Sequence, residues 1–575
     1  MSVFPQRFVR SKVECFSDLK HLVEYGKRMY GNKPYFSYKK DTGICDISFN
    51  QMQDYINKLG TAFHEIGIMG KTIAVLAETR YEWIVSYLAT VNGNGIIVPL
   101  DKEIVPEQII HFIERSKADC VIYSESFAEL MESYAKNGEE KTSGFFINMD
   151  LTPEAEDEPE YKKYNILSFE NLLKTGEELL KKGCAEFIDI KINRDKPCAY
   201  LFTSGTTGTS KAVMLSHRNI ASNAYGAACS VDFKENDVAV AVLPAHHTYE
   251  TTCTFFAAYS LGVNICQNES LKMVLRNFQL YKPTGLILVP LFVDNMVKKI
   301  WDEIDRKGKR KIVEKLIIFS NSLRKIGIDV RRKLFKDIIN AFGGRLELII
   351  SGGAPLNPEH IITLDNFGIR VCQGYGTTEC APLISVIPGD MQMEKVGSVG
   401  YPIFCNEVKI DDRDENGYGE ILVKGDNVMI GYLDNAEATN EAFENGYYKT
   451  GDIGFIDADG YVYITGRKKN IIILNNGKNV YPEEIEEYLY KIKEIKECAV
   501  IARRGNGSEN ITALIVPDYE RFEGKTFIET EKIIKEKADE INKQLPIFKQ
   551  IAEVEVREKE FEKTASKKIK RHLLK

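Results

Sequence analysis

The sequence predicts an α/β fold: a large N-terminal domain of parallel-rich sheets packed with helices, a β-rich subdomain, and a small α+β C-terminal domain. Up to Ile350, short apolar runs typical of buried strands alternate with longer helical stretches, which predicts parallel sheets with helices on both faces. From about Gly397, short strands and glycine turns replace this alternation. Beyond Gly466, two helical stretches and two strands form a unit of ordinary small-domain size.

The N-terminal elements follow from hydrophobic spacing. Residues 16–69 are expected to be helical, because apolar side chains such as Leu19 and Leu22 recur at helical intervals. Residues 132–165 break the alternation that follows, and their acidic stretch 154–160 predicts an exposed insertion. The expected strands are at 71–76, 95–100, 120–123, 198–202, 238–243, 263–267, 284–289 and 345–350, and the first helices between them are at 82–92 and 106–115.

The C-terminal third divides at 466–470. Strands at 408–410, 419–424 and 461–464 predict a β-rich subdomain of about 397–466 within an N-terminal domain of residues 1–466. The C-terminal domain, 467–575, is expected to contain helices at 483–491 and 529–544 and strands at 497–503 and 510–516.

Composition narrows the class of protein. An apolar content of 44% and a charged content of 28% are typical of a soluble globular chain, and the net charge of −7 argues against a general nucleic-acid binder. The 12 cysteines include no C-x-x-C pair, which predicts reduced thiols and a cytoplasmic location. No apolar signal segment is evident at the N-terminus, and no apolar run reaches the roughly 18 residues of a spanning helix.

One loop organises the rest of the chain. The strand at 198–202 runs into Thr-Ser-Gly-Thr-Thr-Gly-Thr-Ser-Lys, in which Gly205 and Gly208 permit sharp turns and Lys211 adds a positive charge. Backbone N–H groups and hydroxyls in such a loop can surround phosphate oxygens. The hydroxyl donors are Thr203, Ser204, Thr206 and Thr207. The spacing is not that of a Walker loop.

Two further motifs, at 351–356 and 373–379, carry groups that suit a nucleotide. Ser-Gly-Gly-Ala-Pro-Leu after the strand at 345–350 would let a flat ring lie against the backbone, although alone this motif is more often a plain turn. In Gln-Gly-Tyr-Gly-Thr-Thr-Glu, Tyr375 offers a stacking face and Glu379 a hard oxygen ligand for Mg²⁺. Farther on, the carboxylate of Asp452 could accept both hydroxyls of a ribose.

Together these motifs resemble those of the adenylate-forming (AMP-binding) superfamily, from about residue 15 to the end of the chain. The family's phosphate loop has Pro before its lysine and Gly after it, where this chain has Ser210 and Ala212. The resemblance implies that Glu379 and Thr207 hold Mg²⁺, that Asp452 and Arg467 hold the ribose, and that Lys469 is a hinge. It implies ATP or AMP contacts from Thr203, Ser204, Gly205, Thr206, Thr207, Gly208, Lys211, Gly352, Gly353, Ala354, Pro355, Gln373, Gly374, Tyr375, Gly376, Thr377, Thr378, Asp452 and Arg467.

The C-terminal tail carries the implied catalytic lysine. Aligned on the family's long-chain pattern, that lysine is Lys568, with Lys567 as the alternative. A cation there would bridge two anions, the attacking carboxylate and the α-phosphate. The family rotates a mobile C-terminal lid so that a second face, here Gly477 and Lys478, replaces this lysine for thioester formation.

The substrate-side motif Leu-Pro-Ala-His-His-Thr-Tyr-Glu resembles the long-chain fatty acid–CoA ligase branch, in which the residue matching His247 lies near the carboxylate. No Asp occurs between Asp237 and Asp294, which disfavours an amino acid as substrate. The leading hypothesis is therefore a fatty acid–CoA ligase that uses ATP, Mg²⁺ and coenzyme A. The alternatives are a ligase that loads an acyl carrier protein, and a binding protein with an inactive site.

Segment 298–336 has 14 basic and 5 acidic residues. Solvated helix faces are the more common explanation for such a segment. The alternative is a surface for anionic lipid at the inner face of the membrane, or for the phosphates of coenzyme A.

Overall fold

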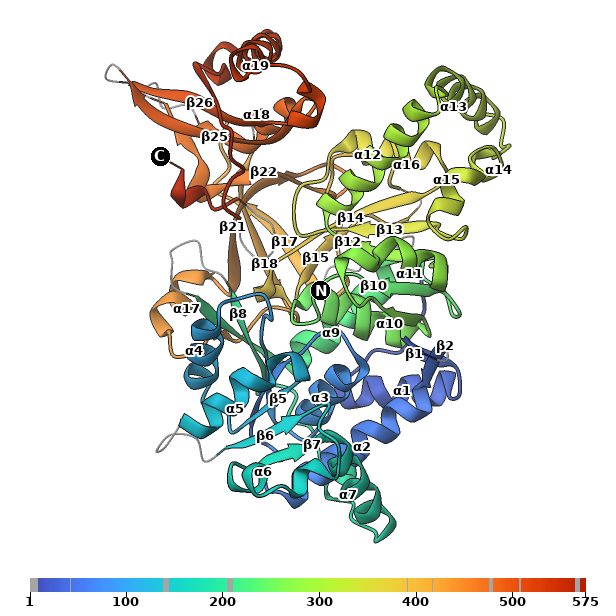
Figure 1. Ribbon diagram of the computed structural model, residues 1–575. Coiled ribbons are helices and arrows are strands. Elements are labelled where there is room, and N and C mark those ends of the chain that lie inside the picture. The colour runs from blue at the N-terminus through green and yellow to red at the C-terminus, as the bar shows by residue number, and fades with distance from the viewer. Residues whose placement is uncertain are drawn as a thin grey trace. The chain divides into compact units, whose positions relative to one another are not determined.

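The computed structural model describes residues 9–41, 43–137, 144–203, 210–389, 391–415, 417–474, 479–505, 508–563 and 569–574. They form two compact units (Figure 1). Unit 1 contains the chain up to Thr203 together with 210–407 and 424–441, and unit 2 contains 408–423 and the chain from Ala442 onward. Among the described residues, no helix is both long and apolar enough to cross a membrane.

The first sheet of unit 1 has eight strands in the order β19-β9-β8-β4-β3-β5-β6-β7. The strands are β3 (Thr72–Leu76), β4 (Ile96–Pro99), β5 (Cys120–Tyr123), β6 (Phe145–Asn148), β7 (Ile166–Ser168), β8 (Pro197–Thr203), β9 (Lys211–Ser216) and β19 (Gly431–Tyr432). Strands β4, β3, β5, β6 and β7 are parallel, whereas β8 and β9 form an antiparallel pair around the phosphate-loop segment. Helices α4 (Pro106–Ser116) and α5 (Ala128–Asn137) share a hydrophobic core with this sheet.

The second sheet of unit 1 has nine strands in the order β16-β15-β14-β13-β12-β10-β11-β1-β2. They are β1 (Pro34–Lys40), β2 (Gly43–Ser48), β10 (Val238–Ala241), β11 (Asn264–Gln267), β12 (Gly285–Leu288), β13 (Leu348–Ser351), β14 (Arg370–Gly376), β15 (Leu383–Val386) and β16 (Tyr401–Pro402). Helices α11 (Val274–Tyr281), α12 (Pro290–Arg306) and α16 (Pro358–Asn366) share one core with it. A π-helix, Tyr249–Ala257, contacts strands β10 and β12 and helix α9 (His217–Ser230).

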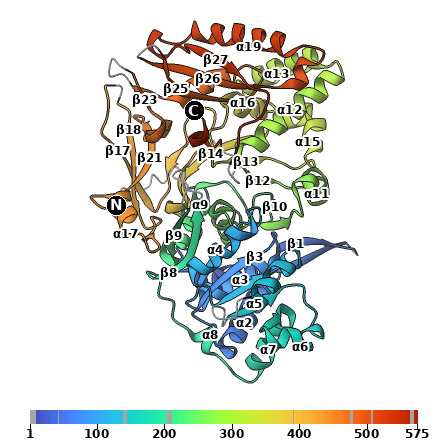
Figure 2. The same ribbon diagram turned by 60° about the vertical axis from the view of Figure 1, so that its left-hand side comes forward.

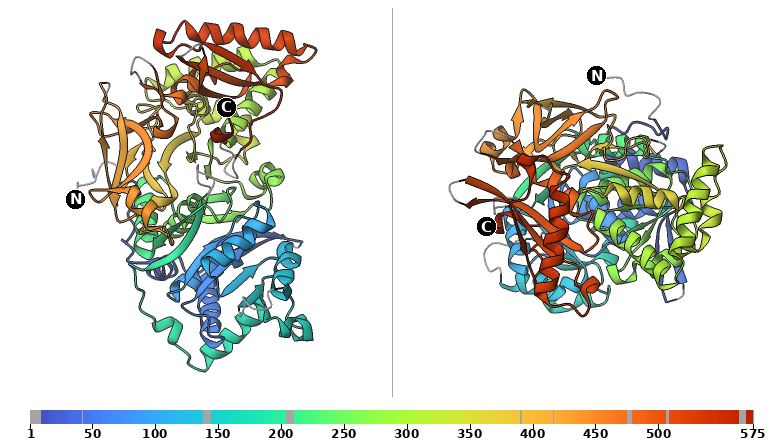
Figure 3. Two further views of the ribbon diagram at one scale, coloured as in Figure 1. Left: turned by 90° about the vertical axis from the view of Figure 1, so that its left-hand side faces the viewer. Right: turned by 90° about the horizontal axis from the view of Figure 1, so that it is seen from above.

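Unit 2 contains a five-stranded sheet in which β18 lies between β17 and β21, and β21 pairs with both β20 and β22. These strands are β17 (Asn406–Asp411), β18 (Gly419–Gly425), β20 (Phe443–Glu444), β21 (Tyr447–Ile456) and β22 (Val462–Arg467). A three-stranded sheet of β25 (Ile495–Gly505), β26 (Ser508–Pro517) and β27 (Glu553–Val556) follows. Helices α18 (Pro482–Leu489) and α19 (Phe527–Asn542) pack on it, and Figures 2 and 3 show α19 lying along this sheet.

The predicted α/β class is confirmed, and the predicted strands from 71–76 to 345–350 all overlap strands of the structure. The expectation for 16–69 is wrong in its middle: between α1 (Leu19–Tyr30) and α2 (Phe49–Glu65) lies the hairpin β1–β2. The reason is non-local, because β1 pairs in parallel with β11, more than 200 residues away, and buries Tyr35 and Phe36.

The expectation for 132–165 is also wrong in part. The apolar run Phe145–Asn148 forms β6, which continues the first sheet by pairing with β5, and β7 continues it further. Only the acidic stretch is peripheral, as a 3-10 turn at Ala155–Asp157 and the short helix α6 (Pro159–Lys163), neither of which has a buried residue.

Candidate active site

The carboxyl ends of β13 and β14 bring two predicted motifs together. The strands are parallel, with Ser351 opposite Gln373, so the glycines after β13 lie beside the glycines of β14. A Cβ atom at Gly352 would lie 3.1 Å from the Gly374 carbonyl oxygen and 3.2 Å from the Tyr249 hydroxyl. The backbone edge is therefore close-packed, and Gly353 has a φ of +85°, which favours glycine.

Two buried polar atoms at this edge have no hydrogen-bond partner among the described residues. They are the Ser351 hydroxyl oxygen and the Gln373 side-chain oxygen. Buried polar groups without partners are uncommon in folded proteins. The donors of a bound ligand would satisfy both, so the edge fits the base that the sequence predicts there.

The end of the phosphate-loop segment lies beside the predicted metal ligand. Strand β19 pairs with β9, and this pairing places the Tyr432 ring 4.6 Å from the Lys211 Nζ. The Tyr432 hydroxyl donates a 2.9 Å hydrogen bond to Oε1 of Glu379, in the turn that follows β14. The structure therefore brings Lys211 and Glu379 to one place through a tyrosine that the sequence reasoning missed.

This arrangement fits Mg²⁺ and a polyphosphate. A carboxylate is the hard oxygen ligand that Mg²⁺ prefers, and the ion commonly takes its remaining oxygens from substrate phosphates and water. Lys211, at the start of β9, supplies the charge that phosphates require. At the end of β8, the Thr203 hydroxyl donates to the Lys211 carbonyl at 3.3 Å.

Several predicted residues lie outside the described residues. They are Ser204, Gly205, Thr206, Thr207 and Gly208 of the loop, Gly477 and Lys478 of the second face, and Lys567 and Lys568 of the tail. Their proposed roles stay predictions.

The two predicted ribose ligands meet within unit 2. Asp452 and Arg467 are directly opposite each other on β21 and β22, and Arg467 Nε lies 2.8 Å from Asp452 Oδ1. The Asp452 side chain is 5% exposed and the Arg467 side chain 47% exposed. A buried carboxylate oriented by an arginine is suited to accept hydroxyl hydrogens.

The predicted hinge contacts helix α18. Lys469 belongs to the 3-10 turn Lys468–Asn470. The Asn470 side-chain amide donates a 2.6 Å hydrogen bond to Glu483 in the first turn of α18. Gly466 lies so close to this glutamate that a Cβ atom there would be 2.7 Å from Glu483 Oε2.

The tail is held on both sides of the segment that contains Lys568. Before it, Lys563 forms an ion pair with Glu497. After it, Arg571 donates a 2.5 Å hydrogen bond to Glu486 of α18 and a 3.1 Å hydrogen bond to the Val500 carbonyl. The backbone of Lys563 also bridges to Ile569, so both ends of the segment are fixed to unit 2.

The histidine pair lies after β10. The His246 and His247 rings are 5.3 Å apart, and His246 Nε2 is 3.6 Å from Oδ2 of Asp101, which follows β4. Burial, with the nearby His247 and Lys102 charges, holds the pKa of His246 well below its ordinary value. The sequence predicted a role for His247. It did not predict the contact between its neighbour His246 and Asp101, which follows a strand of the first sheet.

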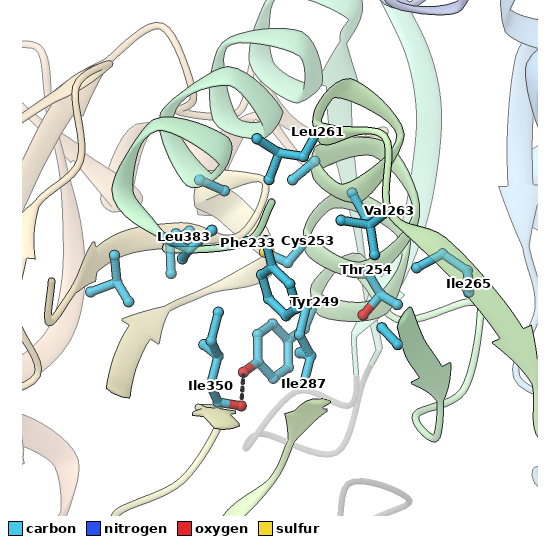
Figure 4. Close-up of a pocket in the computed structure, with 16 residues that line it drawn as sticks. Phe233, Tyr249, Cys253, Thr254, Leu261, Val263, Ile265, Ile287, Ile350 and Leu383 are labelled. Atoms are coloured by element: carbon cyan, nitrogen blue, oxygen red, sulfur yellow. Dashed lines mark hydrogen bonds between the residues drawn. The ribbon is translucent and has the colours of Figure 1, made fainter. Parts of the chain in front are cut away.

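A small cavity of about 30 Å³ lies between α9, the π-helix and the second sheet. Its lining is almost entirely apolar, and Figure 4 shows Tyr249 beside Phe233 and Ile287, with its hydroxyl bonded to the Ile350 carbonyl at 3.2 Å. π-Helical turns are rare and are often found at functional sites.

The same π-helix buries a carboxyl group that the sequence reasoning quoted but gave no role. Glu250 is fully buried, and its Oε2 accepts a 2.7 Å hydrogen bond from Thr254, which lines the cavity. The other oxygen has no partner among the described residues. Burial raises the pKa of Glu250 to about 8.

Comparisons with known proteins agree with these features. Residues 24–433 match the model of the AMP-binding enzyme family, and residues 469–575 match the model of the AMP-binding enzyme C-terminal domain. Long-chain-fatty-acid–CoA ligase 5 of Rattus norvegicus is 30% identical over 541 residues, which cover 88% of this chain and 76% of the relative. Long-chain-fatty-acid–CoA ligase FadD15 of Mycobacterium bovis is 26% identical over 495 residues, 83% of this chain and 78% of the relative.

Solved structures share the fold. The anthranilate CoA ligase AuaEII in complex with anthranoyl-AMP superposes with a TM-score of 0.76 at 20% identity, over 98% of this chain and 97% of that one. The o-succinylbenzoate coenzyme A synthetase of Bacillus subtilis, in complex with ATP and magnesium ion, has a TM-score of 0.71 at 21% identity, over 96% and 98%.

The fold and the site define a class of protein: an α/β enzyme of two units in which the glycine-rich ends of two parallel strands fit a nucleotide base. The chain belongs to the AMP-binding enzyme family, whose two domain models together span most of its length.

Proposed function

We propose that this chain is an AMP-forming fatty acid–CoA ligase for long-chain acids. It activates the acid with ATP to acyl-AMP and then transfers the acyl group to the thiol of coenzyme A. The observation that carries the proposal is the contact of Lys211 with Tyr432 and of Tyr432 with Glu379, because it joins the end of the phosphate loop to the metal ligand. The fatty acid–CoA ligases among its relatives support the choice of acid and thiol.

In the first step, a carboxylate oxygen attacks the α-phosphorus of ATP and pyrophosphate leaves. Lys211 and the loop hydroxyls hold the departing phosphates, and Mg²⁺ bound at Glu379 would neutralise their charge. Asp452 and Arg467 hold the ribose. Lys568 brings the carboxylate and the phosphate together despite their like charges.

In the second step, the thiol attacks the acyl carbon and AMP leaves. The domain from 467 to 575 acts as a mobile lid that turns at Lys469 and replaces Lys568 with the face formed by Gly477 and Lys478.

The apolar cavity beside Tyr249 marks the start of the acyl site. Its volume of about 30 Å³ is that of about one water molecule, so an acyl chain can enter only if side chains of the π-helix and α9 move. His247 lies in the segment between β10 and the π-helix, where the carboxylate would enter. The remaining partners, an acyl carrier protein and a membrane contact through 298–336, are also proposals.

One experiment separates the candidate functions. The protein is supplied with ATP, Mg²⁺ and a panel of acids, together with coenzyme A or an acyl carrier protein, and pyrophosphate and thioester are measured. Long-chain acids are expected to give both products with coenzyme A. If thioester forms only on the carrier protein, then the carrier protein and not coenzyme A is the acceptor. If no acid gives pyrophosphate, an inactive binding protein is favoured.

A further inference from the structure

One outer helix of unit 1 carries an unusual mixture of apolar and basic side chains. Helix α13 (Arg310–Arg324) lies on the outer side of α12 and α16 (Figure 1). The α13 face comprises Lys311, Ile312, Lys315, Ile318 and Phe319 of the helix together with Ile326, which lies just beyond its end. The four apolar members are 54–70% exposed, and Ile328 in the following turn is 49% exposed. No other stretch of equal length in the described chain exposes as many large apolar side chains.

Helical spacing separates this face from the core. Ile312, Lys315 and Phe319 are three and four residues apart, so they lie on one side of the helix. The opposite side, with Val313, Leu316 and Ile317, packs against the core of the second sheet. Exposure of the α13 face therefore does not come from a loosely packed helix.

Polar contacts fix the helix in this orientation. Arg324 forms a 2.5 Å ion pair with the buried Asp365, and Asn321 donates a 2.9 Å hydrogen bond to Asn366. At the other end, the Arg310 guanidinium lies 4.6 Å from the centre of the Trp301 ring. The apolar side chains are held outward by the fold.

The surroundings of the α13 face are strongly positive. Segment 298–336 has 14 basic and 5 acidic residues in a chain of net charge −7. Three of these five acidic residues form ion pairs within the segment: Glu303 with Arg306, Asp305 with Arg310, and Asp329 with Arg331.

Three lysines add to this charge. Lys311, Lys315 and Lys325 form no ion pair with any described residue. Apolar side chains that enter the headgroup layer, flanked by basic side chains, are the chemistry of a helix that lies on an anionic bilayer.

We propose that the α13 face docks on an anionic membrane surface, with its isoleucines and phenylalanine in the headgroup layer and its lysines against lipid phosphates. A second copy of the chain is a poorer occupant, because a two-fold contact would oppose the same lysines to one another. The inference assigns the proposed membrane contact of segment 298–336 to particular side chains, and it does not depend on the proposed reaction. If that function holds, docking would bring the site to acids that dissolve in the bilayer.

The test uses the full chain and two kinds of vesicle, phosphatidylcholine alone and phosphatidylcholine mixed with phosphatidylglycerol. Sedimentation should show binding to the mixed vesicles, weakened by salt. Since each basic side chain near an anionic surface contributes roughly fivefold to binding, the loss of three should weaken it by roughly a hundredfold, and reversing Lys311, Lys315 and Lys325 to glutamate should weaken it by at least that factor. Replacing Ile312, Phe319 and Ile326 with serine should weaken it by about tenfold or more.

A matched control removes equally exposed apolar side chains elsewhere. Leu271, Ile528 and Ile547 are 58%, 76% and 88% exposed, and their replacement by serine should leave vesicle binding unchanged. Equal binding by the parent and both α13 variants would overturn the proposal. So would absence of binding to mixed vesicles, or self-association without lipid that the α13 variants abolish.

Discussion

The buried carboxyl of Glu250 makes the stability of unit 1 depend on pH. Its pKa in the folded chain is about 8, raised by burial from an ordinary value of 4.5, so it keeps its proton at pH 7 while the unfolded chain releases it. The stability that this group contributes is fully present below 4.5 and is lost as the pH rises towards 8. Glu250→Gln keeps the shape and removes the titration.

The magnitude follows from the interval between the two pKa values. Each pH unit in that interval is worth about 1.4 kcal/mol, so the raised pKa of Glu250 lowers the free energy of unfolding, relative to its value below pH 4.5, by about 3 kcal/mol at pH 7 and about 5 kcal/mol above pH 8. The glutamine variant, whose amide can still accept from Thr254, should therefore gain thermal stability that increases from acidic to alkaline pH.

The assay is calorimetric unfolding of parent and variant across this pH range. Glu129→Gln, at an exposed position on α5, is the matched control and should show no such pH-dependent gain. A stability difference that stays constant with pH would refute the reasoning, since it would mean that Glu250 titrates alike in the folded and unfolded chain.

Three further predictions concern the proposed reaction. Lys568→Ala should abolish acyl-AMP formation and leave thioester formation from supplied acyl-adenylate intact, measured as separate half-reactions. Arg571→Ala leaves the buried carboxylate of Glu486 without its ionic partner. It should lower the rate of the first half-reaction at least tenfold and destabilise unit 2 by about 3 kcal/mol in denaturant unfolding. Tyr432→Phe removes a hydrogen bond to the carboxylate of Glu379 and should change the Mg²⁺ concentration needed for half-maximal rate by about tenfold.

Each of these has a control. Lys567→Ala should retain acyl-AMP formation; loss there, with normal rates for the Lys568 variant, would transfer the catalytic role to Lys567. Arg571→Lys should restore part of the first half-reaction, and equal loss of both half-reactions in Arg571→Ala would contradict a role in positioning the tail. An unchanged Mg²⁺ requirement in Tyr432→Phe would contradict the proposal that Glu379 binds the metal.

Local patterns were enough for the elements whose ends carry the motifs. Strand β13 and the Gly352–Gly353 turn could be predicted from an apolar run followed by glycine, because both signals lie within a few neighbouring residues. Strand β14 was not among the expected strands, although the motif at its end was identified. The cross-strand pair of Asp452 and Arg467 was reached only through the family resemblance, and β21–β22 pairing accounts for it.

The features that the sequence did not predict depend on pairing between strands that are far apart in the chain. Tyr432 stands far from Lys211 in the chain and reaches it only because β19 adds to the edge of β9. The hairpin β1–β2 likewise depends on β11. Glu250 ends the motif Leu-Pro-Ala-His-His-Thr-Tyr-Glu, but its burial depends on the packing of the π-helix against the sheet.

The transfer of oxygen from the acid to AMP tests the central claim most directly. A long-chain fatty acid labelled with heavy oxygen in its carboxylate is incubated with the protein, ATP, Mg²⁺ and coenzyme A, and the products are analysed by mass spectrometry. Attack of the carboxylate on the α-phosphorus predicts one labelled oxygen in AMP and none in pyrophosphate. Label in inorganic phosphate together with ADP, or unlabelled AMP beside newly formed thioester, would contradict it.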